Sequence, residues 1–202
     1  MVRGSTRYLV LKRRLDKLRR HLLFFLPPPP MSKTTYTGQE LDLTSAFIVL
    51  AHAEIESFLE ELVLRKAHRA VQQFDATQRV TPILRKLVAY YVAQKRRSWS
   101  EVLLPTPPTV DAAYISFQDY VTNNNGIRRK DIEKLLYPLG VLESSLNQTW
   151  LAQMDSFGFN RGGWAHKTNA ALNPPDPTTE LSTVNQLLQH LLNVDRILNG
   201  LR

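Results

Sequence analysis

Cysteine is absent from this chain of 202 residues. Its absence excludes a disulfide-stabilised scaffold, a zinc site with thiolate ligands and a cysteine nucleophile. The sequence also lacks a run of about 18 apolar residues, which a membrane-spanning helix needs. It has no convincing strand alternation and no internal repeat. Because no secretory signal is recognisable either, we expect a cytoplasmic protein without a membrane span.

Acidic residues are scarce at one end of the chain, and this explains the formal net charge of +8. Residues 1–30 hold eight Lys and Arg residues and one acid, Asp16, so they carry +7. Residues 31–202 hold 18 basic and 17 acidic residues and carry +1. The basic character therefore belongs to the N-terminal segment and says little about the main fold.

This N-terminal segment is open to two interpretations. Its apolar run, Leu22–Leu26, is too short for a signal peptide, and the four prolines at 27–30 form a stiff spacer. One interpretation is a basic amphipathic helix that binds RNA or an anionic membrane. The other is that the fold begins after the prolines, with Met31 as the biological start. We therefore divide the chain into residues 1–30, whose place in the native fold stays open, and a helical domain over residues 31–202.

Helical periodicity dominates that second part. Apolar residues recur at three- and four-residue spacing from Leu41 to about Gln73, and Asp42 or Thr44 is the expected N-cap. Further helices are expected over residues 81–94, 110–121, 129–138 and 142–156. A long last helix should follow Asp176 as its N-cap. The sequence thus predicts an all-α bundle with one long early helix and a long C-terminal helix.

Most catalytic signatures are missing. There is no phosphate-binding glycine loop, no nucleophile elbow and no His-Glu-x-x-His helix, and the five histidines are scattered. We therefore predict neither a metal nor a cofactor. One segment stands out between two expected helices: Asn160-Arg161-Gly162-Gly163-Trp164-Ala165-His166-Lys167.

Arg161 and His166 suit metal-free cleavage of RNA. RNA supplies its own nucleophile, the 2′-hydroxyl, so the protein needs a proton shuttle near neutral pH and a cation beside the phosphate. Histidine provides the first and arginine the second. The spacing alone is weak, because Arg14 and His21 match a similar pattern in the N-terminal segment.

Helix geometry limits how this pair can act. Five residues advance about 500° along a regular helix, which places Arg161 and His166 roughly 140° apart. Two arrangements remain. Either Gly162-Gly163 is non-helical and Arg161 lies at a helix entrance, or the site takes its groups from two chains.

The residues around the pair resemble a known family. Asn160-Arg161-x-x-x-Ala165-His166 before a long final helix is similar to the HEPN superfamily of small helical RNase and nucleotide-binding domains. Residues 51–62, with His52 and Glu56, look like the early helix of its RiboL-PSP-HEPN branch. Residues 126–136 and 139–141 resemble the middle segment of that branch. The resemblance covers about residues 35–202.

The resemblance implies a metal-independent endoribonuclease that leaves a 2′,3′-cyclic phosphate, often the toxin of a toxin–antitoxin or phage-defence system. It implies a homodimer, RNA as substrate and an antitoxin protein as a further partner. Arg161 and His166 would be the catalytic residues, and Asn160, Glu56 and Lys167 would support them.

One position departs from the pattern of the family. A polar residue, often Asn, commonly follows the Arg, and here Gly162 stands there. The alternative is therefore a non-catalytic HEPN module for RNA or nucleotide binding or for dimerisation. Other readings also stay open: Glu56 at a solvated helix edge, Trp164 in the core or at a dimer interface, and the basic triplets 95–97 and 128–130 as weak phosphate contacts.

Overall fold

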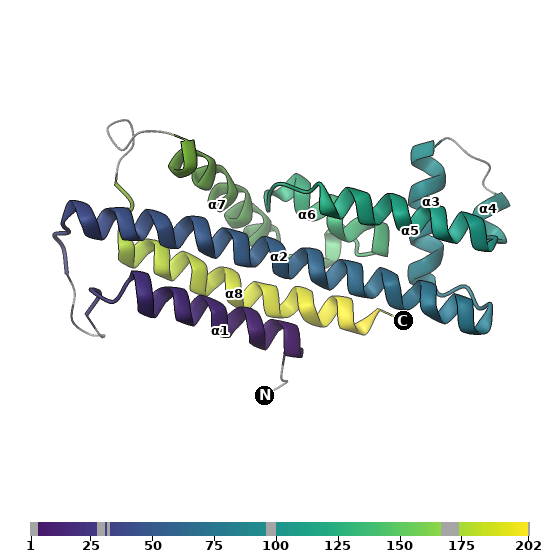
Figure 1. Ribbon diagram of the computed structural model, residues 1–202, viewed down its shortest axis with the longest axis horizontal. Helices are drawn as coiled ribbons and strands as arrows, with labels where there is room; N and C mark the ends of the chain where they lie inside the picture. Colours follow the sequence, from purple (N-terminus) through teal and green to yellow (C-terminus); the bar gives the residue numbers. More distant parts are fainter. Residues whose placement is uncertain (1–3, 28–30, 32, 96–99, 167–173, 202) are drawn as a thin grey trace. The chain divides into compact units, whose positions relative to one another are not determined.

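The computed structural model describes residues 4–27, 31, 33–95, 100–166 and 174–201 (Figure 1). Across these ranges the regular structure is helical and no strand occurs, so the predicted all-α class is confirmed. The elements are α1 (Thr6–Leu22), α2 (Gly38–Thr77), α3 (Pro82–Lys95), α4 (Ser100–Leu103), α5 (Pro107–Thr122), α6 (Arg129–Leu136), the 3₁₀ turns η1 (Tyr137–Leu139) and η2 (Glu143–Ser145), α7 (Gln148–His166) and α8 (Pro177–Gly200).

The chain forms two compact units. Unit 1 comprises Met1–Phe58, Ile127–Arg129 and Asn147–Asn193, and unit 2 comprises Leu59–Gly126, Lys130–Leu146 and Val194–Arg202. The expected long early helix is α2 and the expected long C-terminal helix is α8. Each of these two helices contributes residues to both units. Within the described ranges, no helix has the length and hydropathy to cross a membrane.

The start of α2 differs from the prediction. The helix begins at Gly38 rather than Leu41, and its cap is Thr37 rather than Asp42 or Thr44. The backbone N–H of Glu40 donates to Thr37 Oγ1 (3.3 Å), and the backbone N–H of Thr37 donates to Glu40 Oε2 (2.8 Å). This reciprocal pair is a capping box. It was missed because it precedes the apolar periodicity.

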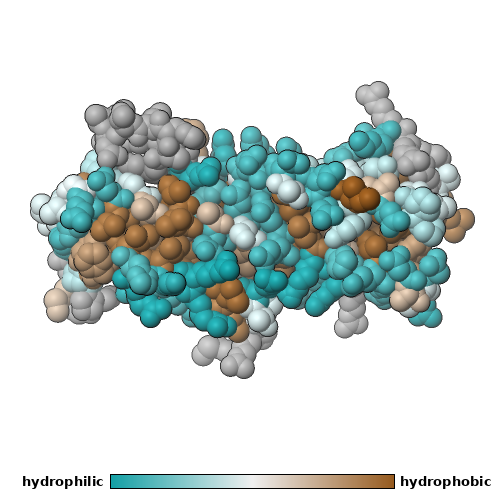
Figure 2. Space-filling model, viewed as in Figure 1, coloured by the Kyte–Doolittle hydropathy of each residue, from teal (hydrophilic) through white to brown (hydrophobic). Residues whose placement is uncertain are grey.

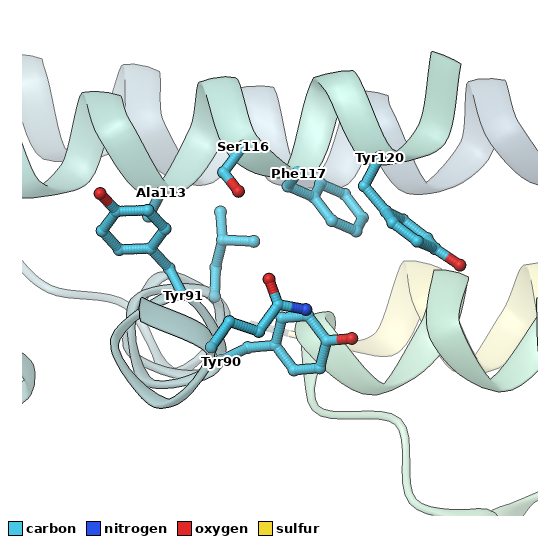
Figure 3. Close-up of a pocket in the computed structure, with 8 residues that line it drawn as sticks. Tyr90, Tyr91, Ala113, Ser116, Phe117 and Tyr120 are labelled. Atoms are coloured by element: carbon cyan, nitrogen blue, oxygen red, sulfur yellow. The ribbon is translucent and has the colours of Figure 1, made fainter. Parts of the chain in front are cut away.

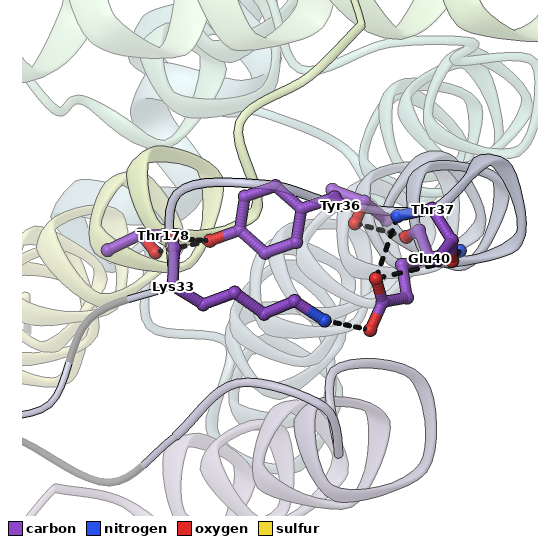
Figure 4. Close-up of polar contacts among 6 residues, drawn as sticks. Lys33, Tyr36, Thr37, Glu40 and Thr178 are labelled. Carbon is purple, nitrogen blue, oxygen red and sulfur yellow. Dashed lines mark hydrogen bonds and ion pairs between the residues drawn. The ribbon is translucent and has the colours of Figure 1, made fainter.

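Thr44, one of the two predicted N-caps, has another place in the structure. Thr44 is buried inside the helix, and its hydroxyl donates to the carbonyl of Glu40 (2.7 Å). The segment before the cap is also anchored: Lys33 bonds Glu40, and the Tyr36 hydroxyl donates to the carbonyl of Lys33 (2.7 Å) (Figure 4). The hydrogen bond from Lys33 is the main reason why the pKa of Glu40 lies below its ordinary value.

The basic N-terminal segment forms α1, and its apolar face is packed within unit 1. Ser5 caps the helix by accepting the backbone N–H of Tyr8 (3.2 Å). Tyr8, Leu11 and Leu15 are buried at helical spacing. The Tyr8 hydroxyl donates to the carbonyl of Leu188 in α8 (3.2 Å), and its ring meets Phe58 of α2 edge to face. The segment is therefore a helix with both an inner and an outer face.

Unit 2 is built around α3, which packs against α4, α5 and η1. Its core contains Ile83, Leu84, Leu87, Val88, Val110, Ala113, Phe117, Val121, Ile132, Leu135 and Leu136. As predicted, Ile132, Leu135 and Leu136 of α6 face inward. Helix α5 starts three residues before the expected Val110, because Pro107 and Pro108 fit the first turn of a helix.

Backbone groups at both ends of α8 have hydrogen-bond partners on side chains. The backbone N–H of Thr179 donates to Asp176 Oδ1 (2.7 Å), which confirms the predicted N-cap. At the other end, Lys66 Nζ donates to the carbonyls of Asn199 (3.4 Å) and Leu201 (3.3 Å) within unit 2. A cation at this position also interacts favourably with the negative end of the helix dipole.

Candidate functional site

Helix α7 carries the Arg161–His166 segment in unit 1. Asn147 starts the helix by accepting the backbone N–H of Trp150 on its side chain (2.9 Å). Trp150, Leu151, Met154 and Phe157 are buried at three- and four-residue spacing and fix this helix in the core. The next turn along the same helix brings Arg161, which is partly exposed.

The backbone of this segment differs from one expectation. We placed Asn160–Lys167 between two helices, whereas α7 continues through Gly162 and Gly163 to His166. The arrangement with a non-helical glycine pair is therefore wrong. Positions 161 and 166 lie on one continuous helix, so they point about 140° apart around its axis.

His52 and Glu56 of α2 lie beside α7. The His52 ring is 1% exposed and stacks on Phe157 of α7, with 6.1 Å between the ring centroids and 25° between their planes. Glu56 follows one turn later, with its Oε2 atom 3.7 Å from His52 Nδ1. The side chain of Glu56 is 17% exposed, so it does not belong to a fully solvated helix edge.

The positive charge of Arg161 on α7 acts on the same His52 side chain. The pKa of His52 is lowered from 6.5 to about 4, mainly by burial and secondarily by the positive charge of Arg161. His52 is therefore neutral at pH 7. His52 Nδ1 and Arg161 Nε are both buried without a hydrogen-bond partner. The cluster formed by His52, Glu56, Phe157 and Arg161, the α2–α7 cluster, thus holds polar atoms with unused bonding capacity.

Two further predicted residues, Asn160 and His166, belong to α7. Asn160 is exposed on α7. His166 is described as the last residue of α7, and Lys167 lies outside the described residues. The α2–α7 cluster thus brings together Arg161 and Glu56, two of the five predicted residues, through their shared neighbour His52. The sequence signals His52 by its position four residues before Glu56, although His52 is not among the five predicted site residues.

The two basic triplets, residues 95–97 and 128–130, differ in what the structure shows of their side chains. Arg128 donates from Nε and Nη2 to the two carboxylate oxygens of Asp155 (3.1 and 3.3 Å), and its guanidinium lies over the Phe159 ring. Arg129 donates to Gln148 (3.0 Å). These two arginines have partners within unit 1, which reduces their value as phosphate contacts. In the other triplet Lys95 is exposed, and residues 96 and 97 lie outside the described part.

A tyrosine-lined hollow in unit 2 is too small to be an active site. Tyr90 and Tyr91 of α3 face Phe117 and Tyr120 of α5 across it (Figure 3). Its volume of about 10 Å³ has room for a single water molecule. Burial, with a smaller effect of Tyr90 and Asp131, raises the pKa of Tyr120 to about 12, so this phenol stays protonated.

Acidic and histidine side chains do not gather into a metal site in the described part of the chain. Comparison with known proteins adds no assignment: no protein-family model, no curated protein and no solved structure matches this chain. The case for a function therefore depends on the α2–α7 cluster and on the sequence around it.

Proposed function

We propose that this chain is a metal-independent endoribonuclease of the HEPN type, with Arg161 and His166 as its catalytic pair. The observation that carries the proposal is the state of Arg161. Its Nε is buried without a partner, beside a neutral imidazole, on the helix that ends at His166. An arginine with a purely structural role normally satisfies its donors with carboxylates or carbonyls. An unused donor on a cation fits an anionic substrate group.

The proposed reaction uses the 2′-hydroxyl of RNA. His166 accepts the proton of that hydroxyl while its oxygen attacks the phosphorus, and the protonated imidazole then protonates the departing 5′-oxygen. Arg161 stabilises the extra negative charge on the pentacoordinate phosphorus. The products are a 2′,3′-cyclic phosphate and a 5′-hydroxyl. Because His52 is neutral at pH 7, Arg161 is the cation that this cluster offers to the phosphate.

The helical path of α7 favours a site shared by two chains. While α7 keeps its helical path, positions about 140° apart cannot meet at one phosphate, whereas two copies of α7 can present Arg161 from one and His166 from the other. The proposal therefore includes a homodimer with two equivalent sites related by a twofold axis.

The direct test is a cleavage time course on labelled total RNA and tRNA with EDTA present. Wild type should produce fragments, His166→Ala should lower the rate by about 10²- to 10⁴-fold, and Arg161→Ala by about 10²- to 10³-fold. His68→Ala, at an exposed position in unit 2, is the matched control and should cleave like wild type. His21→Ala tests the second Arg–His pair: a loss of cleavage there, with His166→Ala active, would refute the assignment.

A mixing experiment tests the shared site. Subunits of Arg161→Ala and His166→Ala are combined under conditions in which dimers exchange. If each site takes one residue from each chain, half of the dimers are hybrids and each hybrid has one intact site. Activity should then recover to about a quarter of wild type. No recovery, with exchange verified by mass spectrometry, would show that both residues act within one chain.

The second candidate is a non-catalytic module that binds RNA or a nucleotide. Gly162 favours it, because a glycine follows Arg161 where the resembling family commonly has a polar side chain. RNA binding without fragments from any variant, wild type included, would establish this function instead.

The cellular role proposed from the resemblance is that of a cytoplasmic toxin neutralised by an antitoxin protein. Expression of wild type should arrest growth of the host cell, and His166→Ala should not. Growth arrest by both variants at equal protein levels would contradict a toxic RNase activity at this site.

A further inference from the structure

We infer that the outer face of α1, with the groove beside it on α2, binds the phosphate backbone of single-stranded RNA. The inference takes the identity of the nucleic acid from the proposed function, but it does not depend on cleavage. Four observations support it. They are the positive charge of α1, the burial of its apolar face, the residues that line the groove, and the fact that the groove shares no residue with the α2–α7 cluster.

The charge of α1 is concentrated on its outer face. The helix contains seven Lys and Arg residues and one acid, a net charge of +6. The exposed basic residues of α1 are Lys12, Arg13, Arg14, Lys17, Arg19 and Arg20. Glu54 of α2 pairs with one of them, Arg14 (2.9 Å). This pair offsets one of these positive charges, and the net charge of α1 remains strongly positive, so the face attracts a polyanion.

The inner face of α1 decides between RNA and a membrane. An amphipathic helix binds a bilayer by inserting its apolar face between the lipids. In this helix Tyr8, Leu11 and Leu15 are buried in unit 1, and Tyr8 is further held by its hydrogen bond to Leu188 and its contact with Phe58. Insertion would require α1 to leave the core. What α1 offers to a partner is charge, and RNA provides a continuous line of phosphates.

The groove beside α1 adds a place for the rest of a nucleotide. Its volume is about 550 Å³, within the usual range for ligand sites. Arg14, Lys17 and His21 of α1 line it together with Glu54 of α2, and Leu18, Leu22 and Leu50 provide its apolar surface. Figure 2 shows apolar surface bordered by hydrophilic side chains over the part of the view where α1, α8 and the first half of α2 lie in Figure 1. Cations beside an apolar surface suit a strand with phosphates on one side and bases on the other.

Helix geometry places two of these groups together. Arg14 and His21 are seven residues apart on α1, so they lie about 20° apart around its axis and share one face. The exposed Phe24 follows the same end of the helix and offers a ring on which a base can stack. The groove differs from the α2–α7 cluster in every residue, and none of its lining side chains has a role in the proposed reaction.

The experiment measures binding of a labelled single-stranded RNA to the full chain by fluorescence anisotropy at several salt concentrations. All proteins carry His166→Ala, so that binding is separated from cleavage. Removing two charges with Lys17→Gln and Arg20→Gln should weaken binding by about tenfold at low salt and should reduce the salt slope by about 1.4, because each lost phosphate contact on single-stranded RNA removes about 0.7. Arg79→Gln with Arg85→Gln, at exposed positions in unit 2, removes the same charge elsewhere and should change affinity less than twofold.

A second pair of variants tests the groove rather than the charge of α1. Leu50 of the groove and Ile115 of α5 are exposed to similar extents, 44% and 55%. Leu50→Glu places a negative charge in the groove and should weaken RNA binding by about tenfold, whereas Ile115→Glu should have little effect. Circular dichroism and thermal melting confirm that each variant is folded.

Three results would overturn the inference. These are equal losses in the α1 and control variants, no loss in either, and binding to phosphatidylserine vesicles with no binding to RNA. The outcome is independent of the proposed function: binding lost in the Lys17 and Leu50 variants without any cleavage by wild type supports the groove and refutes the nuclease. Cleavage by wild type with unchanged binding in those variants does the reverse.

Discussion

The buried imidazole of His52 on α2 lies within the electrostatic reach of the guanidinium of Arg161 on α7. Burial is the larger cause of the low pKa of His52, and the positive charge of Arg161 lowers it further. One nitrogen of each residue has no hydrogen-bond partner: Nδ1 of His52 and Nε of Arg161. The pair therefore leaves hydrogen-bonding capacity that a polar or anionic group beside Arg161 would satisfy.

This relationship predicts a loss of stability in acid. The folded pKa of His52, about 4, lies below the ordinary value of 6.5, so the unfolded chain takes up the proton first as the pH falls. The free energy of unfolding should not respond to His52 above pH 6.5. It should decline between pH 6.5 and 4, by about 3 kcal/mol in total. Urea unfolding at pH 7, 6, 5 and 4 measures this decline.

The control for that prediction is His52→Phe. Other groups, such as Glu40 with its lowered pKa, also destabilise the fold in acid, and this variant keeps them while removing the imidazole. Its stability should fall less steeply than that of wild type between pH 6.5 and 4. Parallel profiles for the two proteins would show that His52 has the same pKa in the folded and unfolded states.

Glycine at position 78 should stabilise the protein. Gln78 follows the end of α2 with φ of 55°, a left-handed conformation that costs a side chain energy. Gln78→Gly removes this cost but also the side-chain bond from Gln78 Nε2 to the carbonyl of Phe74 (3.3 Å). We expect a net gain of about 0.5–1 kcal/mol in chemical unfolding. Gln73→Gly, at an exposed position inside the same helix, should lose about 1 kcal/mol.

Loss of the capping box should be measurable. Thr37→Ala removes the hydroxyl that accepts the backbone N–H of Glu40, and it should lower the free energy of unfolding by about 1 kcal/mol. Gln39→Ala is the control, because Gln39 is exposed in the same turn. Equal effects of the two substitutions would mean that the cap contributes nothing beyond helix propensity.

The docking of α1 predicts that residues 1–30 contribute to stability. Tyr8→Phe removes the hydrogen bond to Leu188 and should cost about 1 kcal/mol. Tyr8→Ala also empties a buried site and should cost about 3–5 kcal/mol, as large-to-small changes at buried aromatic rings do. Phe24→Ala, at an exposed ring just after α1, should be close to neutral. A chain beginning at Met31 that melts at the same temperature as the full chain would contradict this prediction.

The helices could be predicted because their apolar periodicity is strong, and α6 and the Asp176 cap of α8 are clear examples. Helix starts were less predictable. Thr37 and Pro107 precede the first buried residues of their helices, so periodicity alone places the start too late. Local capping chemistry carries this information and acts before the apolar pattern begins.

The candidate site was harder to predict. The sequence marked Arg161 and Glu56, but it could not show that they share His52 as a neighbour, because that contact joins residues more than a hundred positions apart. The path of the chain through Gly162 and Gly163 was also open from sequence, since glycine disfavours a helix without forbidding it. The structure continues the helix there.

Gly162 and Gly163 lower the stability of the last helical turn of α7. Each glycine makes the helical state about 1 kcal/mol less favourable than alanine would, so the pair raises the equilibrium constant for unwinding this turn about thirtyfold. The opposed orientation of positions 161 and 166 is a property of the wound state alone. A ligand that gains a few kcal/mol from drawing the two residues together can thus repay the unwinding. The last turn of α7 therefore unwinds at a lower cost in free energy than the same turn with alanine at both positions would.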